Sequence, residues 1–167
     1  MTAACVKISA MWIDAIDLRG FYATTLGRVA RRAVRGRVRD IWPDTRGMRV
    51  LGIGYAAPYL DPFRGEAERV IAAMPAAQGV LSWPGEGAGQ STLCDEAELP
   101  FADLSMDRVL LVHALECAEN VRPMMREIWR VLGGGGRLLV VVPNRRGIWA
   151  RFERTPFGQG RPYSPGQ

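Results

Sequence analysis

The stretch that decides the fold is Arg49–Leu60, RVLGIGYAAPYL. A short apolar run from Val50 to Ile53 leads into Gly54, and small residues and a proline follow. This pattern predicts a buried parallel strand that ends in a tight turn. In a doubly wound α/β sheet the turn after the first strand lies beside the ligand. The backbone has to approach the ligand closely there, and side chains would block it.

Other apolar runs after this stretch predict further strands, because they are short, β-branched and bounded by turn residues. We predict strands at residues 69–74, 91–94, 107–113 and 137–142. Strands that alternate with helical segments are typical of a parallel sheet. The sequence therefore predicts a Rossmann-like, doubly wound α/β sheet in the order 3-2-1-4-5, with helices on both faces.

Two long segments have apolar residues at helical spacing. Residues 24–41 predict a helix that Thr24 or Thr25 caps, and residues 120–132 predict a second helix. Glycine favours helix C-termini, so we expect residues 133–136 to end the second helix. We expect residues 66–70 to form a short helix or a loop.

Composition bounds the class of protein. The chain has 167 residues, about one domain, and its 48% hydrophobic content is enough for a packed core. Apolar runs such as Leu138–Val142 are too short to cross a bilayer, and residues 1–10 lack a secretory signal. The three cysteines, Cys5, Cys94 and Cys117, have no metal-ligand spacing and are typical of reduced thiols in a cytoplasmic protein. With His113 as the single histidine, we expect no metal site.

The net charge of +5 is unevenly distributed, with an acidic middle between two arginine-rich flanks. Residues 19–49 hold nine arginines. We favour a solvated face on a helix that packs against the sheet over a nucleic-acid surface. Lys7 is the only lysine, and we attribute this bias to a GC-rich, bacterial-type coding genome.

Three stretches together resemble the class I S-adenosylmethionine-dependent methyltransferases of the small-molecule type. They are VLGIGYAAPYL, then DEAELPFADLSMDRVLLVHALE from Asp95 to Glu116, and MMREIWRVLGGGGRLLVVVPN from Met124 to Asn144. The first departs most from the family pattern. Gly54 is kept, but Gly52 replaces an acid, and Ala56 and Pro58 replace glycines. Because Ala56 disfavours positive φ and Pro58 has no N–H, we expect weak cofactor binding.

The resemblance implies S-adenosylmethionine as the cofactor. It implies a cofactor site made of Gly52, Gly54, Tyr55, Ala56, Met74, Pro75, Asp95, Glu96, Ala97 and His113. Asp95 or Glu96 would accept a hydrogen bond from the adenine amine, or would be an ordinary solvated acid. Met74 and Pro75 stand where the family has an acid for the ribose, and Met74 would otherwise simply close a pocket.

His113 has three interpretations at the end of its strand. It lines the methionine end of the cofactor, or it is bonded to a backbone carbonyl, or it is the catalytic base for an acceptor hydroxyl or amine. In-line methyl transfer needs little beyond collinear donor and acceptor, so the sequence does not identify the acceptor.

The predicted organisation has three parts. Residues 1–23 are an N-terminal segment and possible lid that includes Phe21 and Tyr22, with Met11 as an alternative start to Met1. Residues 24–144 are the methyltransferase-type domain, and residues 145–167 a basic, Gly- and Pro-rich tail. The resembled family continues with two more strands. We therefore expect the native protein to extend past Gln167, or two copies to pair as a homodimer through the apolar edge at 138–142.

The first functional hypothesis is a methyltransferase acting on an unknown small-molecule acceptor. The second is a non-catalytic protein of the same fold that binds the cofactor weakly or not at all. Its support is the altered loop and Met74. The third is a nucleic-acid-modifying or nucleic-acid-binding relative, and the two basic flanks support it.

Overall fold

The computed structural model of the chain describes residues 13–143. Both possible starts, Met1 and Met11, and the expected tail at 145–167 lie outside this range. None of the helices within it is long and apolar enough to cross a membrane.

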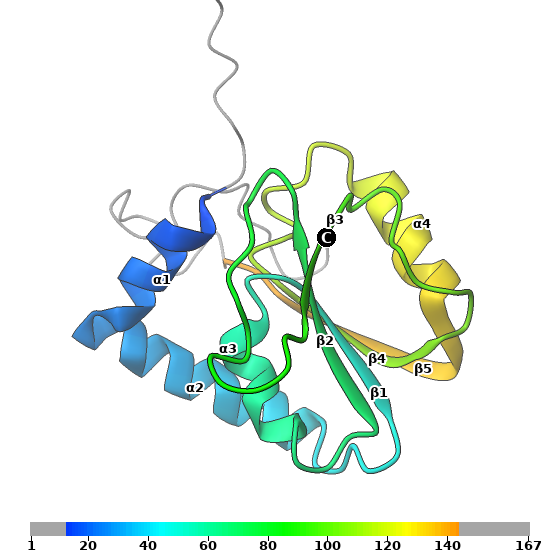
Figure 1. Ribbon diagram of the computed structural model, residues 1–167, viewed down its shortest axis with the longest axis horizontal. Helices are drawn as coiled ribbons and strands as arrows, with labels where there is room; N and C mark the ends of the chain where they lie inside the picture. Colours follow the sequence, from blue (N-terminus) through cyan, green and yellow to red (C-terminus); the bar gives the residue numbers. More distant parts are fainter. Residues whose placement is uncertain (1–12, 144–167) are drawn as a thin grey trace, which may run out of the picture.

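Five parallel strands form one sheet in the order β3-β2-β1-β4-β5 (Figure 1). The strands are β1 Arg49–Gly54, β2 Arg69–Pro75, β3 Ser91–Cys94, β4 Met106–Val112 and β5 Leu132–Val141. Adjacent strands pair in parallel throughout, with β1 in the middle between β2 and β4. The predicted fold class and strand order are confirmed.

The start of β5 differs from the prediction. Helix α4, Val121–Val131, is followed at once by β5, and residues 133–136 lie within the strand rather than forming a separate helix end. Leu132 pairs with Met106, and the register shifts between Met106 and Arg108. Gly135 has a positive φ of 80° there. The glycines at residues 133–136 thus form the irregular beginning of β5 and do not cap α4.

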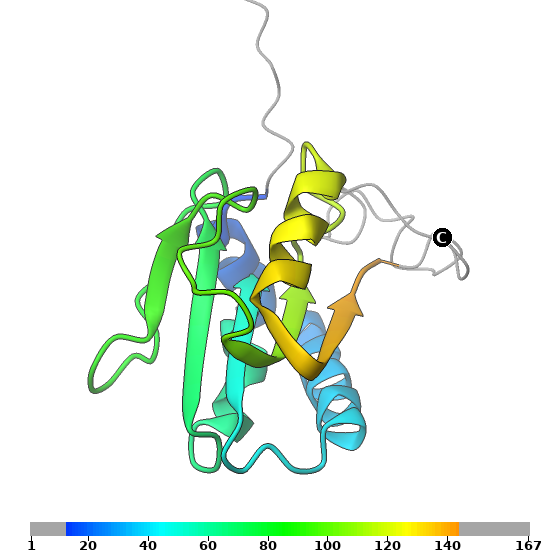
Figure 2. The same cartoon turned by 90° about the vertical axis from the view of Figure 1, so that its right-hand side faces the viewer.

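The other helices are α1 Ala15–Ala23, α2 Thr25–Ile41 and α3 Ala57–Leu60, with a 3-10 turn η1 at Asp61–Phe63. Helices α1 to α3 cover one face of the sheet, and α4 covers the other (Figures 1 and 2). Thr24 caps α2, because its hydroxyl accepts from the Gly27 N–H. Of the short helix or loop expected at 66–70, residues 66–68 form the loop and residues 69–70 belong to β2. The helical turns come earlier, where prolines occupy first-turn positions of α3 and η1.

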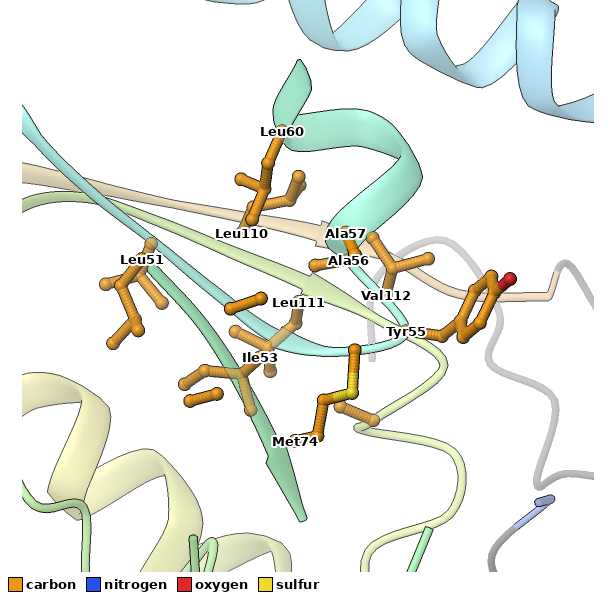
Figure 3. Packing of buried hydrophobic residues seen from close by; sticks show 14 of the residues in the cluster. Leu51, Ile53, Tyr55, Ala56, Ala57, Leu60, Met74, Leu110, Leu111 and Val112 are labelled. Carbon is orange, nitrogen blue, oxygen red and sulfur yellow. The ribbon is translucent and has the colours of Figure 1, made fainter. Parts of the chain in front are cut away.

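The core lies on both faces of the sheet at β1 and β4. Leu51 and Ile53 of β1 and Leu110 and Leu111 of β4 are fully buried. Leu60 of α3 lies beside Leu110, whereas Leu51 and Ile53 point to the opposite face of the sheet (Figure 3). Burying such side chains contributes roughly 1.5–3 kcal/mol each. The centre of the sheet therefore fixes the positions of the turns at its carboxyl edge.

The outer edge of β5 remains apolar. Residues 139–142 and helix α2 line a groove of about 410 Å³. Within residues 13–143 no strand pairs with this edge. The strand expected beyond Gln167 lies outside the described residues.

A charged cluster ties α2 to the turn before β2. The Glu66 carboxylate accepts from both Arg39 guanidinium nitrogens at 2.8 Å and from the backbone N–H of buried Thr45 at 2.8 Å. These bonds, first from Arg39 and then from Thr45, lower the pKa of Glu66 from 4.5 to about 2. A carboxylate whose pKa falls on folding stabilises the protein above its unfolded pKa.

We predict that Glu66→Gln lowers the free energy of unfolding at pH 7. The difference from the native chain should shrink as the pH falls from about 4.5 towards 2, because protonation removes the same bonds. Denaturant unfolding of both proteins at pH 7 and pH 3 measures it. Glu68→Gln is the matched control, since Glu68 is exposed. A difference that stays constant across this pH range would contradict the prediction.

Candidate functional site

The turn after β1 brings the ends of β1 and β4 into contact. Gly54 has a φ of +79°, and a Cβ at this position would lie 2.4 Å from the Val112 carbonyl oxygen. The next residue, Tyr55, donates its backbone N–H to the same oxygen at 2.8 Å. Both the dihedral angle and the space therefore require glycine here.

The other unusual residues of this loop have structural reasons. A Cβ at Gly52 would lie 2.6 Å from the Ala56 Cβ and 2.7 Å from Leu60 Cδ1, so α3 packs directly on β1 and leaves no room for an acid. Ala56 has a φ of −85°, an ordinary helical value. The expected conflict between Ala56 and a positive φ is therefore wrong. Pro58 lies in the first turn of α3, where proline is well tolerated.

His113 follows β4 directly and is 2% exposed. Its φ of 51° is strained for a residue other than glycine, and such strain clusters at functional sites. The ring lies between two side chains, with Nδ1 3.0 Å from Glu116 Oε1 and Nε2 2.8 Å from the Tyr22 hydroxyl. An ionised carboxylate only accepts. In the neutral imidazole Nδ1 therefore carries the hydrogen, and Nε2 accepts from Tyr22.

Helix α1 covers this histidine. The Tyr22 ring stacks on Tyr55 with centroids 5.5 Å apart and planes 6° from parallel. Burial raises the pKa of Tyr22 well above its usual range, so its hydroxyl stays protonated. The Ala15 N–H donates to the Gln78 carbonyl at 2.8 Å, and Gln78 Nε2 donates to the His113 carbonyl at 3.0 Å. Both ends of α1 are thus fastened over the ends of β1 and β4.

Two side-chain oxygens near His113 are buried beneath helix α1 without a hydrogen-bond partner in the described part of the chain. Gln78 Oε1 and Glu116 Oε2 have no hydrogen-bond partner within residues 13–143. A buried polar oxygen without a partner is costly, by about 1–3 kcal/mol. Such atoms mark places where a ligand or a water molecule would be stabilised.

A cavity of about 400 Å³ lies at the same edge of the sheet, beyond the ends of β2 and β3. Its lining includes Asp95, Glu96 and Ala97, together with Ala76 and Ala77. Asp95 Oδ1 accepts from the Ala97 N–H at 2.8 Å and shapes this turn. Carboxylates on one wall suit a ligand that carries amine or hydroxyl donors.

The predicted site residues therefore fall into two groups at one edge. Gly54, Tyr55 and His113 lie under α1, whereas residues 95–97 line the open cavity. Met74 is buried, and its sulfur accepts from the Leu81 N–H at 3.2 Å, while Pro75 ends β2. That one cofactor contacts both groups stays a prediction. Tyr22 packs beside His113, and Gln78, which bonds to the His113 carbonyl, follows Ala77 of the cavity wall in the chain.

Sequence reasoning missed Gln78 and did not assign a role to Glu116. Gln78 lies in a turn after β2 with no periodic pattern, so no local signal pointed to it. The spacing of His113 and Glu116, three residues apart after a buried strand, was a usable signal for a histidine–carboxylate pair.

Comparison with known families places these features in context. Residues 42–140 match the family model described as a methyltransferase domain. The match spans more than half of the chain, so the chain belongs to this family. No curated protein matches the sequence.

Solved structures share the fold. A SAM-dependent methyltransferase from Archaeoglobus fulgidus superposes with a TM-score of 0.63 at 19% identity, covering 90% of this chain and 67% of that one. A putative S-adenosyl-L-methionine-dependent methyltransferase from Methanococcus maripaludis gives 0.58 at 16% identity, with 84% and 66% covered. YcgJ from Bacillus subtilis gives 0.55 at 24% identity, with 65% and 50% covered. The chain spans 50–57% of the length of the first structures it matches.

We predict that Gly54→Ala lowers the free energy of unfolding by about 2 kcal/mol or more, because the new Cβ meets backbone atoms and the positive φ strains alanine. Gly36→Ala is the control. Gly36 is an exposed glycine of α2 with no atom near its Cβ position, so alanine should stabilise by about 0.5–1 kcal/mol. Thermal and denaturant unfolding measure both. A neutral Gly54→Ala would contradict the close approach described here.

Proposed function

We propose that this chain is the cofactor-binding part of an S-adenosylmethionine-dependent methyltransferase that acts on a small-molecule acceptor. The observation that carries the proposal is the acid-lined cavity at Asp95–Ala97, on the same sheet edge as the glycine turn at Gly54. In doubly wound sheets ligands bind at this carboxyl edge. Membership of the methyltransferase domain family supports the choice of cofactor.

The residues present fit one half of the cofactor well. Asp95 or Glu96 would accept from the adenine amine. The methionine half would lie at Gly54 and Tyr55, where Tyr22 now packs. Binding would therefore require α1 to move, in agreement with the lid expected at residues 1–23.

When bound, the cofactor would supply an electrophilic methyl group. The chain's own contribution would be to orient the acceptor and to take its proton. His113 Nε2 accepts a hydroxyl hydrogen bond from Tyr22 in the present arrangement. An acceptor hydroxyl in that position would meet a histidine that Glu116 orients through Nδ1. Glu116 would act as a positioning residue.

The alternative function is a non-catalytic protein of the same fold. The fastening of α1 through Tyr22 and Gln78 favours it, as does Met74 in place of a ribose-binding acid. Direct binding of the cofactor product separates the two.

We predict that the folded protein binds S-adenosylhomocysteine with 1:1 stoichiometry in a calorimetric titration. The double variant Asp95→Asn, Glu96→Gln should bind about tenfold more weakly, because it removes the charged acceptors. Glu98→Gln, an exposed neighbour outside the cavity, should bind within about twofold of the native chain. Absence of binding by folded native protein would instead support the non-catalytic alternative.

A further inference from the structure

A second and larger cavity, of about 620 Å³, lies on the helical face away from residues 95–97. It opens between α1, α2, the turn after β1 and the loop at residues 81–86. Tyr55 belongs both to its wall and to the group of side chains around His113. The methyltransferase site proposed above shares Tyr55 with this cavity, and its acid-lined part at residues 95–97 lies elsewhere.

Three arginines from different elements line it. Arg19 comes from α1, Arg31 from α2 and Arg64 from the end of η1. Within residues 13–143 the ion pairs involve other arginines, such as Arg39 and Arg49, and none of these three. An arginine without a carboxylate partner keeps its donors available for an anion.

The acids of the same cavity do not neutralise these arginines. Asp61 accepts the indole N–H of Trp83 at 3.0 Å, and so part of its capacity is used. Glu86 lies on the exposed loop. Three positive charges against two negative ones leave the cavity with net positive charge.

Tyr55 adds a hydroxyl donor. Its ring is 4% exposed, and its hydroxyl points away from the buried side chains around it (Figure 3). Burial raises the pKa of Tyr55, and the charges of Arg19 and Arg31 oppose part of this rise. Two cations and a neutral donor therefore line the same cavity.

Apolar side chains also line the cavity. Trp83 is 8% exposed, and the Arg64 guanidinium lies over its ring at 5.5 Å from the centroid. Leu81 and Pro58 also belong to the lining. An aromatic ring held rigidly beside a cation is suited to a planar ligand.

We propose that this cavity binds a small anionic ligand with a planar apolar body, an aromatic carboxylate or phosphate ester. The anionic group lies among Arg19, Arg31 and the Tyr55 hydroxyl, and the planar body packs against Trp83 and Leu81. The argument for this site does not rest on the methyltransferase proposal, although the two sites share Tyr55 and both involve helix α1.

Phenyl phosphate is the probe, with inorganic phosphate and phenol as its two halves. Binding is followed by two-dimensional NMR through the indole N–H of Trp83, assigned with a Trp83→Phe variant. We expect a saturable shift with phenyl phosphate, and affinity at least about tenfold higher than for either half, because both the arginines and the apolar side chains contribute. If inorganic phosphate bound as tightly as phenyl phosphate, the proposal that the cavity recognises a planar apolar body would be overturned.

Matched variants test the charges. Arg19→Gln and Arg31→Gln should each weaken phenyl phosphate binding about fivefold or more. Arg35→Gln makes the same change of charge on the exposed part of α2, outside the cavity, and should leave the affinity within about twofold. Circular dichroism confirms that each variant is folded. Equal weakening by Arg35→Gln would mean a general basic surface and would overturn the site.

A titration with a ten-residue oligothymidine distinguishes the source of the anion. For a small-molecule site the oligonucleotide should not compete with phenyl phosphate at 150 mM salt. Steeply salt-dependent competition would indicate a nucleic-acid surface instead and would overturn the proposal.

Discussion

The arrangement of the carboxyl edge of the sheet depends on the contact between the ends of β1 and β4. Gly54 allows the Val112 carbonyl to approach so closely that any side chain would collide with it, and Tyr55 then bonds to that same carbonyl. One residue further along β4 lies His113, in a strained conformation of its own. The glycine thus fixes where Tyr55 and His113 are placed relative to each other.

Helix α1 is organised around this contact. Its Tyr22 stacks on Tyr55 and bonds to His113, and its first residue is anchored to Gln78. The result is a buried set of tyrosine, histidine and glutamate side chains at the edge where sheets of this class bind ligands. Under the proposed function, the contacts that stabilise α1 would occupy the space that the methionine part of the cofactor needs. The proposal therefore couples the stability of α1 on the sheet to cofactor access.

Much of the fold was predictable because its signals are local. The apolar run before Gly54 and the one before His113 identify β1 and β4, and Thr24 caps α2 as its side-chain chemistry suggests. The beginning of β5 was not predictable in the same way. Glycines that follow a helical pattern predict the end of the helix. In the structure residues 133–136 belong to β5 instead, because this strand pairs with β4. Helix α3 and the 3-10 turn η1 each have a proline in the first turn, a position that proline favours.

The candidate site was predictable only in part. The glycine turn and the loop at Asp95 follow strands, so their place at the edge comes from topology alone. The contact between Tyr22 and His113 joins residues 91 positions apart, and no local pattern encodes it. Gly52 and Ala56 were interpreted as losses from a binding loop. In the structure they allow α3 to pack on β1, which composition and spacing do not reveal.

Hydrogen exchange measured by mass spectrometry, with and without saturating S-adenosylhomocysteine, tests the central claim most directly. If the edge under α1 is the functional site, the ligand should change exchange in residues 15–23, slow it in residues 54–59 and 95–97, and leave α4 unaffected. Unchanged exchange in these segments, or protection confined to α4 and β5, would contradict the account.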